Sequence, residues 1–258
     1  MYVSLRTAML AAVALASAHA LGQGPISPLY LEAGGTMWVV QGTTASSSNN
    51  VSSNEYNLAV DGDIRTTQYR GSGDGYQYGL NGVATGTSYG GTWLGFFDGT
   101  TDGSSNYTLD YDTGNVWAFD RNWQNGSNLF QLSGGSGGYL GITYDDAGGL
   151  WVSQWDGTNI QHYSMNGTLL GQFSTGINDM TCLALDPANG TLWFGSQTVE
   201  GTFWNYSTSG TLLGSESYSN LVGVNALGGE FNVTAAPEPA SMAALVGGIA
   251  LLVRRRRR

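Results

Sequence analysis

The feature that most constrains the fold of this chain is a repeat built around turns. Residues 141–155 (GITYDDAGGLWVSQW) and 182–196 (CLALDPANGTLWFGS) each place an Asp and a Gly-containing turn between two β-rich runs. Comparable stretches occupy residues 29–42, 57–69, 107–120 and 221–234. Because two short β-rich runs joined by such a turn are typical of a β-hairpin, each stretch predicts a pair of antiparallel strands.

A second hairpin follows several of the first ones. The stretches YSMNGTLLGQF (163–173) and YSTSGTLLGSE (206–216) carry Asn-Gly or Ser-Gly between short strands. Asn-Gly is a strong hairpin signal because both residues accept positive φ. One full unit is therefore two hairpins, or four strands, and the two clearest units are 43 residues apart, from Asn166 to Ser209. Four-stranded units at this spacing are typical of β-propeller blades.

We therefore predict an all-β fold: a β-propeller-like repeat of about five or six blades over residues 29–234. The composition agrees, because 40 Gly, 12% aromatic residues and only 11% charged residues favour strands and turns over helices. The first and last copies of the repeat are both incomplete, so we expect them to combine into one closing blade. A β-sandwich is the alternative architecture.

Aromatic residues recur at one place in the predicted hairpins. The residues there are Trp38, Trp117, Trp151, Trp193 and Phe231. Recurrence in nearly every unit indicates packing between blades, since a binding site needs only one copy. Tryptophans outside this series are better candidates for a surface that stacks on sugar rings, because aromatic faces suit pyranose rings. These candidates are Trp93, Trp123, Trp155 and Trp204.

The charge of the body excludes one class of partner. The chain has no Lys, and residues 21–236 contain 18 acidic residues and three Arg, a net charge of about −15. A surface with this charge repels the phosphates of nucleic acids. No nucleic-acid partner is therefore expected.

No catalytic or metal-binding constellation is visible along the sequence. His162 is the one histidine outside the first 20 residues, and the one cysteine, Cys182, lies in an apolar run typical of a small buried side chain. Most acidic residues occur at turns, where a short side chain can bond the turn backbone. The stretch DGTTDGSSN (98–106) is a weak calcium candidate, because it lacks the spacing of a calcium-binding loop.

We therefore expect a non-enzymatic body without a cofactor that binds a polysaccharide or a protein partner. One alternative is a secreted propeller hydrolase of the lactonase or glycosidase type. Propellers that resemble such enzymes use a metal or a His-rich site at the axis, and a pair of distant carboxylates could also converge there. The other alternative is a structural or ice-binding surface protein.

The first 20 residues have the pattern of a secretory signal peptide. An early Arg6 precedes an apolar run from residue 8 to residue 18, and Ala18 and Ala20 form an A-x-A cleavage site. Export through the Sec translocon is therefore expected. Residues 21–28 are predicted to be a linker between this leader and the repeat.

The C-terminal segment, residues 235–258, has three parts in a fixed order. Pro237, Glu238 and Pro239 come first, followed by an apolar stretch at 240–253. As a helix this stretch would be about 21 Å long, too short for a hydrocarbon core of roughly 30 Å. The chain ends with positive residues that stay on the cytoplasmic side of a membrane. They are Arg254, Arg255, Arg256, Arg257 and Arg258.

This three-part terminus resembles the PEP-CTERM sorting signal of Gram-negative-type bacteria. The resemblance covers about 22 residues and implies that the chain is a substrate of the membrane transpeptidase exosortase. It also implies a transient hold in the inner membrane through the short helix and processing near Pro-Glu-Pro. Delivery to the cell surface or the extracellular matrix would follow, often in organisms that make exopolysaccharide.

Overall fold

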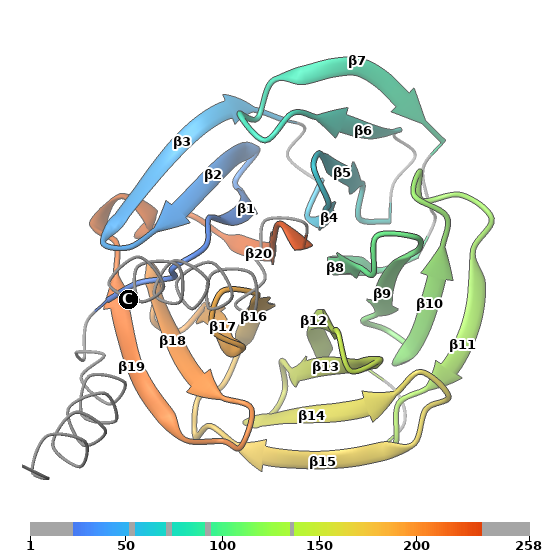
Figure 1. Cartoon of the computed structure of the whole chain (residues 1–258), viewed down its shortest axis with the longest axis vertical. Helices are drawn as coiled ribbons and strands as arrows, with labels where there is room; N and C mark the ends of the chain where they lie inside the picture. The colour runs from blue at the N-terminus through green and yellow to red at the C-terminus, as the bar shows by residue number, and fades with distance from the viewer. Residues whose placement is uncertain (1–22, 52–54, 71–73, 91–93, 135–136, 234–258) are drawn as a thin grey trace, which may run out of the picture.

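The computed structural model describes residues 23–51, 55–70, 74–90, 94–134 and 137–233. These residues form five four-stranded antiparallel sheets arranged as blades around a central axis (Figure 1). All-β architecture and a five-bladed propeller are thereby confirmed. The leader, the Pro-Glu-Pro motif, the apolar stretch and the Arg tail lie outside the described residues, and no helix within the described ranges is long and apolar enough to cross a bilayer.

In every blade the four strands lie side by side, from an innermost strand at the axis to an outermost strand (Figure 1). Blade 1 contains, from the innermost strand to the outermost, β20 (Ala226–Phe231), β1 (Leu29–Ala33), β2 (Thr36–Gln41) and β3 (Thr44–Asn50). In the same order, blade 2 contains β4 (Asn57–Val60), β5 (Ile64–Thr67), β6 (Gly75–Tyr78) and β7 (Ala84–Tyr89). Blade 3 contains β8 (Phe96–Thr101), β9 (Asn106–Asp110), β10 (Asn115–Phe119) and β11 (Ser127–Gln131). Blade 4 contains β12 (Tyr139–Asp145), β13 (Gly149–Gln154), β14 (Asn159–Ser164) and β15 (Leu169–Ser174). Blade 5 contains β16 (Met180–Asp186), β17 (Thr191–Ser196), β18 (Thr202–Ser207) and β19 (Leu212–Ser217), and the short 3-10 helix η1 (Ser219–Leu221) follows it.

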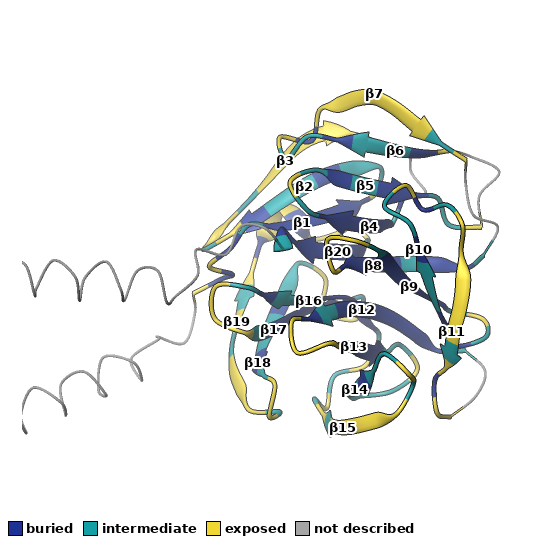
Figure 2. Ribbon diagram, turned by 45° about the vertical axis from the view of Figure 1, so that its right-hand side comes forward, coloured by how far each residue is buried: buried dark blue, intermediate teal, exposed yellow. Residues whose placement is uncertain are grey.

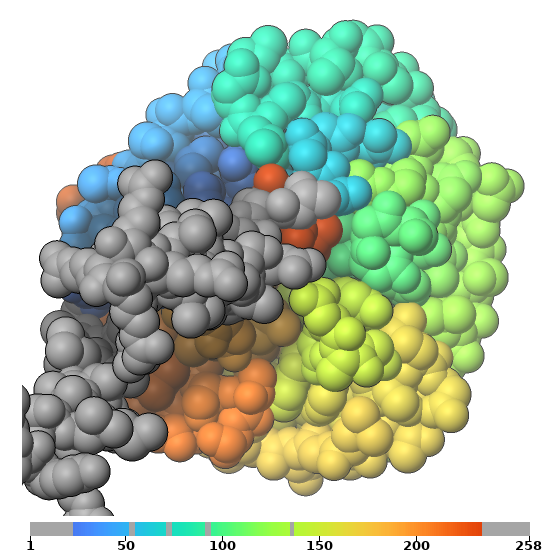
Figure 3. All heavy atoms as spheres, viewed as in Figure 1, coloured from blue at the N-terminus to red at the C-terminus, as the bar shows by residue number. Residues whose placement is uncertain are grey.

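The two faces of the ring differ in the loops that they carry. We call one face of the ring the top face. It carries the connections between blades and the turns between the second and third strands of each blade, and the innermost strands begin there. The other two turns of each blade lie on the bottom face. The last strand, β20, pairs with β1 and completes blade 1, so the two incomplete repeats do combine (Figure 1). In the space-filling view the colours of successive blades follow one another around the ring (Figure 3).

The predicted repeat mixes two kinds of hairpin. In blades 4 and 5 the turns at Asp145 and Asp186 join the first and second strands, as expected. In blades 1 and 3 the stretches 29–42 and 107–120 instead form the second and third strands. Trp38 and Trp117 therefore do not share the place of Trp151 and Trp193. The physical reason is that the turn between the first and second strands and the turn between the second and third strands both join β-rich runs with buried residues, so the two kinds of turn look alike in sequence.

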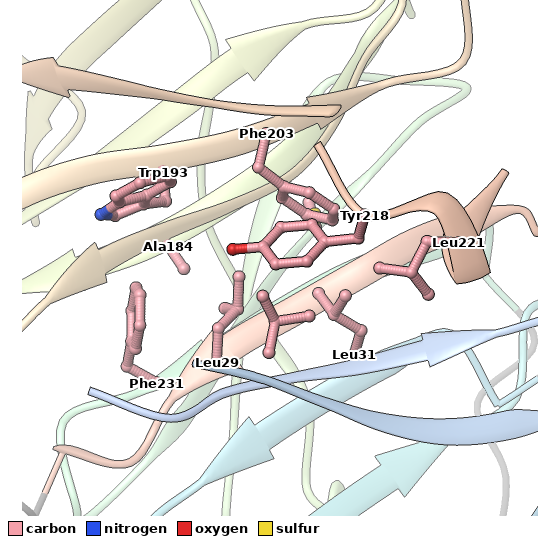
Figure 4. Packing of buried hydrophobic residues seen from close by; sticks show 10 residues of the cluster. Leu29, Leu31, Ala184, Trp193, Phe203, Tyr218, Leu221 and Phe231 are labelled. Atoms are coloured by element: carbon pink, nitrogen blue, oxygen red, sulfur yellow. The ribbon is translucent and has the colours of Figure 1, made fainter. Parts of the chain in front are cut away.

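Burial decreases from the axis outward, because inner strands pack between neighbouring blades (Figure 2). The closing interface between blades 1 and 5 shows this packing (Figure 4). Trp193 there is 1% exposed and packs with Leu29, Leu31 and Phe203. Each fully buried apolar side chain of this size contributes roughly 1.5 to 3 kcal/mol to folding.

Residues 23–28, which precede β1 and are called the N-terminal arm, make polar contacts at the same interface. Asp186, at the end of β16, accepts hydrogen bonds from the backbone N–H of Ile26 at 2.9 Å and from the hydroxyl of Ser27 at 2.7 Å. Part of the segment expected to be a linker is thus fixed against blade 5. The contact between Ile26 and Asp186 joins residues that are 160 positions apart in the sequence.

A buried carboxylate ties four blades together at the axis. Asp98, on β8, accepts hydrogen bonds from the backbone N–H groups of Ile142 (2.9 Å), Leu183 (3.0 Å) and Gly229 (2.9 Å). These donors belong to blades 4, 5 and 1. Burial raises the pKa of Asp98 to about 8, and the N–H groups act in the opposite direction. In β12 and β16 the strand pairing shifts immediately before the donor residue, and such bulges redirect backbone groups.

Hydroxyl side chains form a second polar layer beside Asp98. Thr100 on blade 3 accepts the N–H of Tyr144 at 2.9 Å, and Thr143 on blade 4 accepts the N–H of Leu185 at 3.1 Å. Thr143 in turn donates to the buried Glu230 at 3.0 Å. The axis is therefore filled by protein groups of adjacent blades.

We predict that Asp98→Ala strongly destabilises the propeller. The substitution leaves three buried N–H groups without an acceptor, and each such group costs about 1 to 3 kcal/mol. Urea unfolding should show a loss of about 3 kcal/mol or more, whereas Asp146→Ala, at an exposed turn position, should change stability little. Equal stability of the two variants would contradict this role of the axial carboxylate.

Candidate functional site

The histidine of the body lies in an ordered cluster on blade 4. His162 on β14 faces Trp151 on β13 across the strand pair, and the two rings stack with centroids 4.1 Å apart and planes 3° apart. Its Nε2 lies 2.8 Å from Oδ2 of Asp145, which also accepts the indole N–H of Trp151 at 3.2 Å. The N–H direction of Nε2 does not point at Oδ2, so the short contact is not a hydrogen bond. Asp145 instead stands beside the ring as a neighbouring negative charge.

Local sequence explains why the cluster forms here. Asp145 ends the innermost strand, and its second carboxylate oxygen accepts the N–H of Ala147 at 2.6 Å, which fixes the turn. Gly149 then opens the next strand directly beneath the imidazole. A Cβ at residue 149 would lie 2.4 Å from Nε2 of His162, so only glycine leaves room for this ring position.

A cleft of 490 Å³ opens beside the cluster between blades 4 and 5, on the side of the bottom face. Asp145, Trp151 and His162 form its inner wall, and the side chain of His162 keeps 18% of its surface exposed. Leu170 and Phe173 supply an apolar wall. The remaining lining residues are Gly171, Gln172, Thr208 and Ser209.

The cleft combines a proton-exchanging group with hydrogen-bonding groups. Nδ1 of His162 has no hydrogen-bond partner among the described residues, so it can exchange a proton with a bound molecule. Neutral imidazole accepts a proton and imidazolium donates one near neutral pH, which suits general acid–base chemistry. The hydroxyl groups of Thr208 and Ser209 and the amide of Gln172 can bond oxygen atoms of a ligand.

A pair of carboxyl groups lies elsewhere, buried between blades 1 and 2. Glu32 is 0% exposed and Glu55 is 1% exposed. Burial raises the pKa of Glu32 to about 8, and the nearby charge of Glu55 adds to the effect. Because neither carboxyl group reaches the surface, this pair does not meet a substrate in the way that an acid pair of a glycosidase must.

The other polar candidates have structural partners. Asp98 binds backbone N–H groups at the axis, and Asp102 accepts the N–H groups of Ser104 at 2.8 Å and Ser105 at 2.7 Å. Over the described ranges, no three His, Cys, Asp or Glu side chains are grouped so that they could hold a metal ion. The axial metal site of lactonase-like propellers therefore does not fit the residues around Asp98. Cys182 is buried, and burial raises the pKa of its thiol to about 12.

Of the four tryptophans proposed as ligand aromatics, the three that the structure describes lie in different surroundings. Trp123 is 1% exposed, and its indole N–H donates to the carbonyl of Arg65 at 2.9 Å. Trp204 is partly buried on blade 5, where it stacks on Phe194 with ring centroids 5.9 Å apart. Trp155 is partly exposed on the top face of blade 4, and Trp93 lies outside the described residues.

Comparison with known proteins identifies the family. A family model described as SMP-30/Gluconolactonase/LRE-like region matches residues 32–198, which is more than half of the chain. The chain therefore belongs to this family. A search of curated proteins found no match.

Solved structures confirm the propeller fold. Glutaminyl cyclase of Myxococcus xanthus is similar with a TM-score of 0.52 at 16% identity, covering 75% of this chain and 76% of that one. A chain of a nidogen/laminin complex is similar with a TM-score of 0.54 at 12% identity, covering 79% of this chain and 97% of that one. At these identities the likeness concerns the fold alone.

Family membership corrects the expectation of a non-enzymatic body, which was wrong. That expectation depended on the absence of a catalytic constellation along the sequence. Strand pairing places Trp151 opposite His162, and the preceding turn brings Asp145 beside them. Pairing residues at equal distances on either side of the turn between β13 and β14 could have predicted that Trp151 faces His162. It could not have predicted that Asp145, at the end of β12, also contacts His162.

We predict that Glu32 makes the protein less stable as the pH rises. Its pKa is about 8 in the folded state and near 4.5 when exposed, so unfolding releases a proton between these values. Stability should fall across this window by up to about 1.4 kcal/mol per pH unit for this group. Chemical unfolding at pH 5, 6.5 and 8 should show a shallower decline for Glu32→Gln than for the unchanged protein. Glu200→Gln is the exposed control, and equal slopes in all three proteins would contradict the prediction.

Proposed function

We propose that the chain is an exported hydrolase that opens cyclic esters, with His162 as the acid–base residue. The proposal depends mainly on one observation: the Asp145–His162–Trp151 cluster lines the 490 Å³ cleft. Membership in a family named for gluconolactonase supports the lactone as the substrate class. The sequence already offered a secreted hydrolase as an alternative, with its site expected at the axis. The site proposed here is instead the cleft between blades 4 and 5.

The reaction needs one proton acceptor that later becomes a donor. Nδ1 of His162 takes a proton from water while the water oxygen attacks the lactone carbonyl carbon. The ring C–O bond of the lactone then breaks, and the imidazolium returns the proton to the departing alkoxide oxygen. One lactone and one water give one hydroxy acid.

The surroundings of His162 suit both halves of this cycle. Oδ2 of Asp145 lies 2.8 Å from Nε2 of His162, so a carboxyl group stands next to the ring that takes up the proton. Stacking on Trp151 holds the ring in one orientation, so the proton-accepting nitrogen stays aligned. Thr208 and Ser209 provide donors for the hydroxyl and carbonyl oxygens of a sugar-derived lactone.

We predict that His162→Gln abolishes lactone opening while the fold is retained. Loss of the proton acceptor should lower kcat by about a hundredfold or more. The purified full chain would be tested against a panel of five- and six-membered sugar lactones, with acid release followed by pH-stat titration. Asp146→Asn changes an exposed carboxyl group one residue from Asp145 and serves as the control.

Two results would contradict the proposed function. One is a folded protein that opens no lactone above the uncatalysed rate. The other is lactone opening that survives His162→Gln at the rate of the Asp146→Asn control. Circular dichroism of each variant would establish that folding is unchanged.

We further propose that the enzyme reaches the cell surface or the extracellular matrix as an exosortase substrate. The Pro237–Pro239 motif, the apolar stretch 240–253 and the five terminal Arg support this, together with the A-x-A site at Ala18 and Ala20. The Sec translocon and exosortase would be its transient partners. The short helix would tether it to the inner membrane until processing.

We predict that deletion of residues 254–258 misroutes the protein. Without Arg to remain on the cytoplasmic side, the short apolar helix should lose its hold on the membrane before processing. Fractionation of cells that express the full chain would show where each form accumulates, and mass spectrometry would define its C-terminus. Mature surface protein that still carries Arg258 would contradict the sorting proposal.

A further inference from the structure

Four aromatic rings gather on the top face, over blades 2 and 3. Tyr56 and Phe97 lie at the start of the inner strands β4 and β8, and Tyr69 and Tyr111 lie just after β5 and β9. Phe97 is the centre of the group. Its ring stacks on Tyr69 at 4.2 Å, meets Tyr111 edge-on at 5.5 Å and lies 6.0 Å from Tyr56. These four residues are the top-face aromatic cluster.

This cluster differs from the aromatic packing between blades. All four of its rings remain partly exposed, whereas Trp193 and Phe231 in the closing interface are at most 1% exposed. The cluster also lies close to the axis, because a Cβ at Gly228 would meet the carbonyl oxygens of both Tyr56 and Phe97. The rings thus form a partly open apolar surface at the axial end of the propeller.

Two residues with strained backbone lie near the cluster, Arg70 next to Tyr69 in the chain and Asp179 near Tyr111. Arg70 and Asp179 have positive φ values of 44° and 50°, although neither is glycine. Such conformations persist where the surrounding structure holds them and often border functional sites. Arg70 pairs with Asp112, and its guanidinium lies 5.0 Å from the ring centre of Tyr69.

Carboxylates near Tyr69 and Tyr111 outnumber the one nearby cation and leave this rim of the cluster negative. Asp112 and Asp156 are exposed, and Asp179 is partly exposed. Burial raises the pKa of Tyr111, and the charges of Asp156 and Asp112 raise it further, so these groups lie near the cluster. In the part of the chain that the structure describes, Arg70 is the one cation beside the rings, because Arg65 and Arg121 are paired with Asp63 and Asp61 on the bottom face.

We infer that the top-face aromatic cluster binds a neutral or amino-bearing pyranose chain. The C–H faces of pyranose rings pack on aromatic faces, and their hydroxyl groups donate hydrogen bonds to carboxylates. The negative rim repels polymers that carry uronate or sulfate groups and favours an amino sugar. This surface lies on the opposite face of the ring from the cleft with His162, so glycan binding is independent of lactone opening.

The test measures glycan binding by the full chain and by one pair of matched variants. Calorimetry would use four probes: cellohexaose, N-acetylated chitohexaose, a chitosan hexamer and an oligogalacturonate. Tyr69→Ala should weaken binding of at least one of the first three by about tenfold. Tyr144→Ala is the control, because Tyr144 is another partly exposed stacked tyrosine, located on blade 4 near the bottom face.

A second measurement needs no variant and covers the case that Tyr69→Ala fails to fold. Aromatic ring signals of Tyr69, Phe97 and Tyr111 should shift in NMR spectra of the unchanged protein when the bound glycan is added, while those of Tyr144 should stay. Binding of oligogalacturonate alone, absence of binding to all four probes, or ring shifts confined to other residues would overturn the inference. None of these results tests the proposed lactone opening by His162, which is measured separately.

Discussion

The propeller depends on the hydrogen bonds that Asp98 accepts at its axis. Each innermost strand pairs on one side only, so its other edge would expose N–H groups to the centre of the ring. One carboxylate accepts three of these groups, from blades 4, 5 and 1. Thr100 and Thr143 accept two more. These side-chain acceptors link the inner strands where backbone pairing ends, and they allow five blades to meet closely.

A filled axis determines where functional surfaces can lie. Gly99 of blade 3 approaches Asn57 of blade 2 so closely that a Cβ would lie 1.9 Å from the side-chain oxygen of Asn57, so these inner strands are in direct contact. The two proposed functional surfaces lie between blades, in the cleft beside His162, and on a face, at the top-face aromatic cluster. The first places an imidazole beside hydrogen-bonding groups, which suits chemistry. The second is aromatic and partly exposed, which suits binding.

The sequence predicted the propeller because turn chemistry is local, whereas the site depends on contacts that are not. Asn-Gly turns and the 43-residue spacing of blades 4 and 5 indicated four-stranded units. From its neighbours in the sequence, Asp98 looked like part of a possible calcium loop. Its true partners were not visible there, because the N–H groups that donate to it belong to residues 44, 85 and 131 positions away. His162 looked isolated for the same reason. Its carboxylate partner lies two strands away in the same blade, at a turn where Asp is expected for backbone reasons alone.

Comparison of blades 4 and 5 explains why only one of them carries the cluster. Trp193 on β17 faces Asn205 on β18, just as Trp151 faces His162. In blade 5, however, the turn carboxylate of Asp186 is occupied by the N-terminal arm, and an amide stands where blade 4 has the imidazole. One copy of the repeat therefore uses its aspartate to close the ring. In the other copy, the equivalent aspartate, Asp145, instead lies beside the histidine that borders the cleft. The same turn residue thus contacts the N-terminal segment in one blade and the histidine of the proposed site in the next.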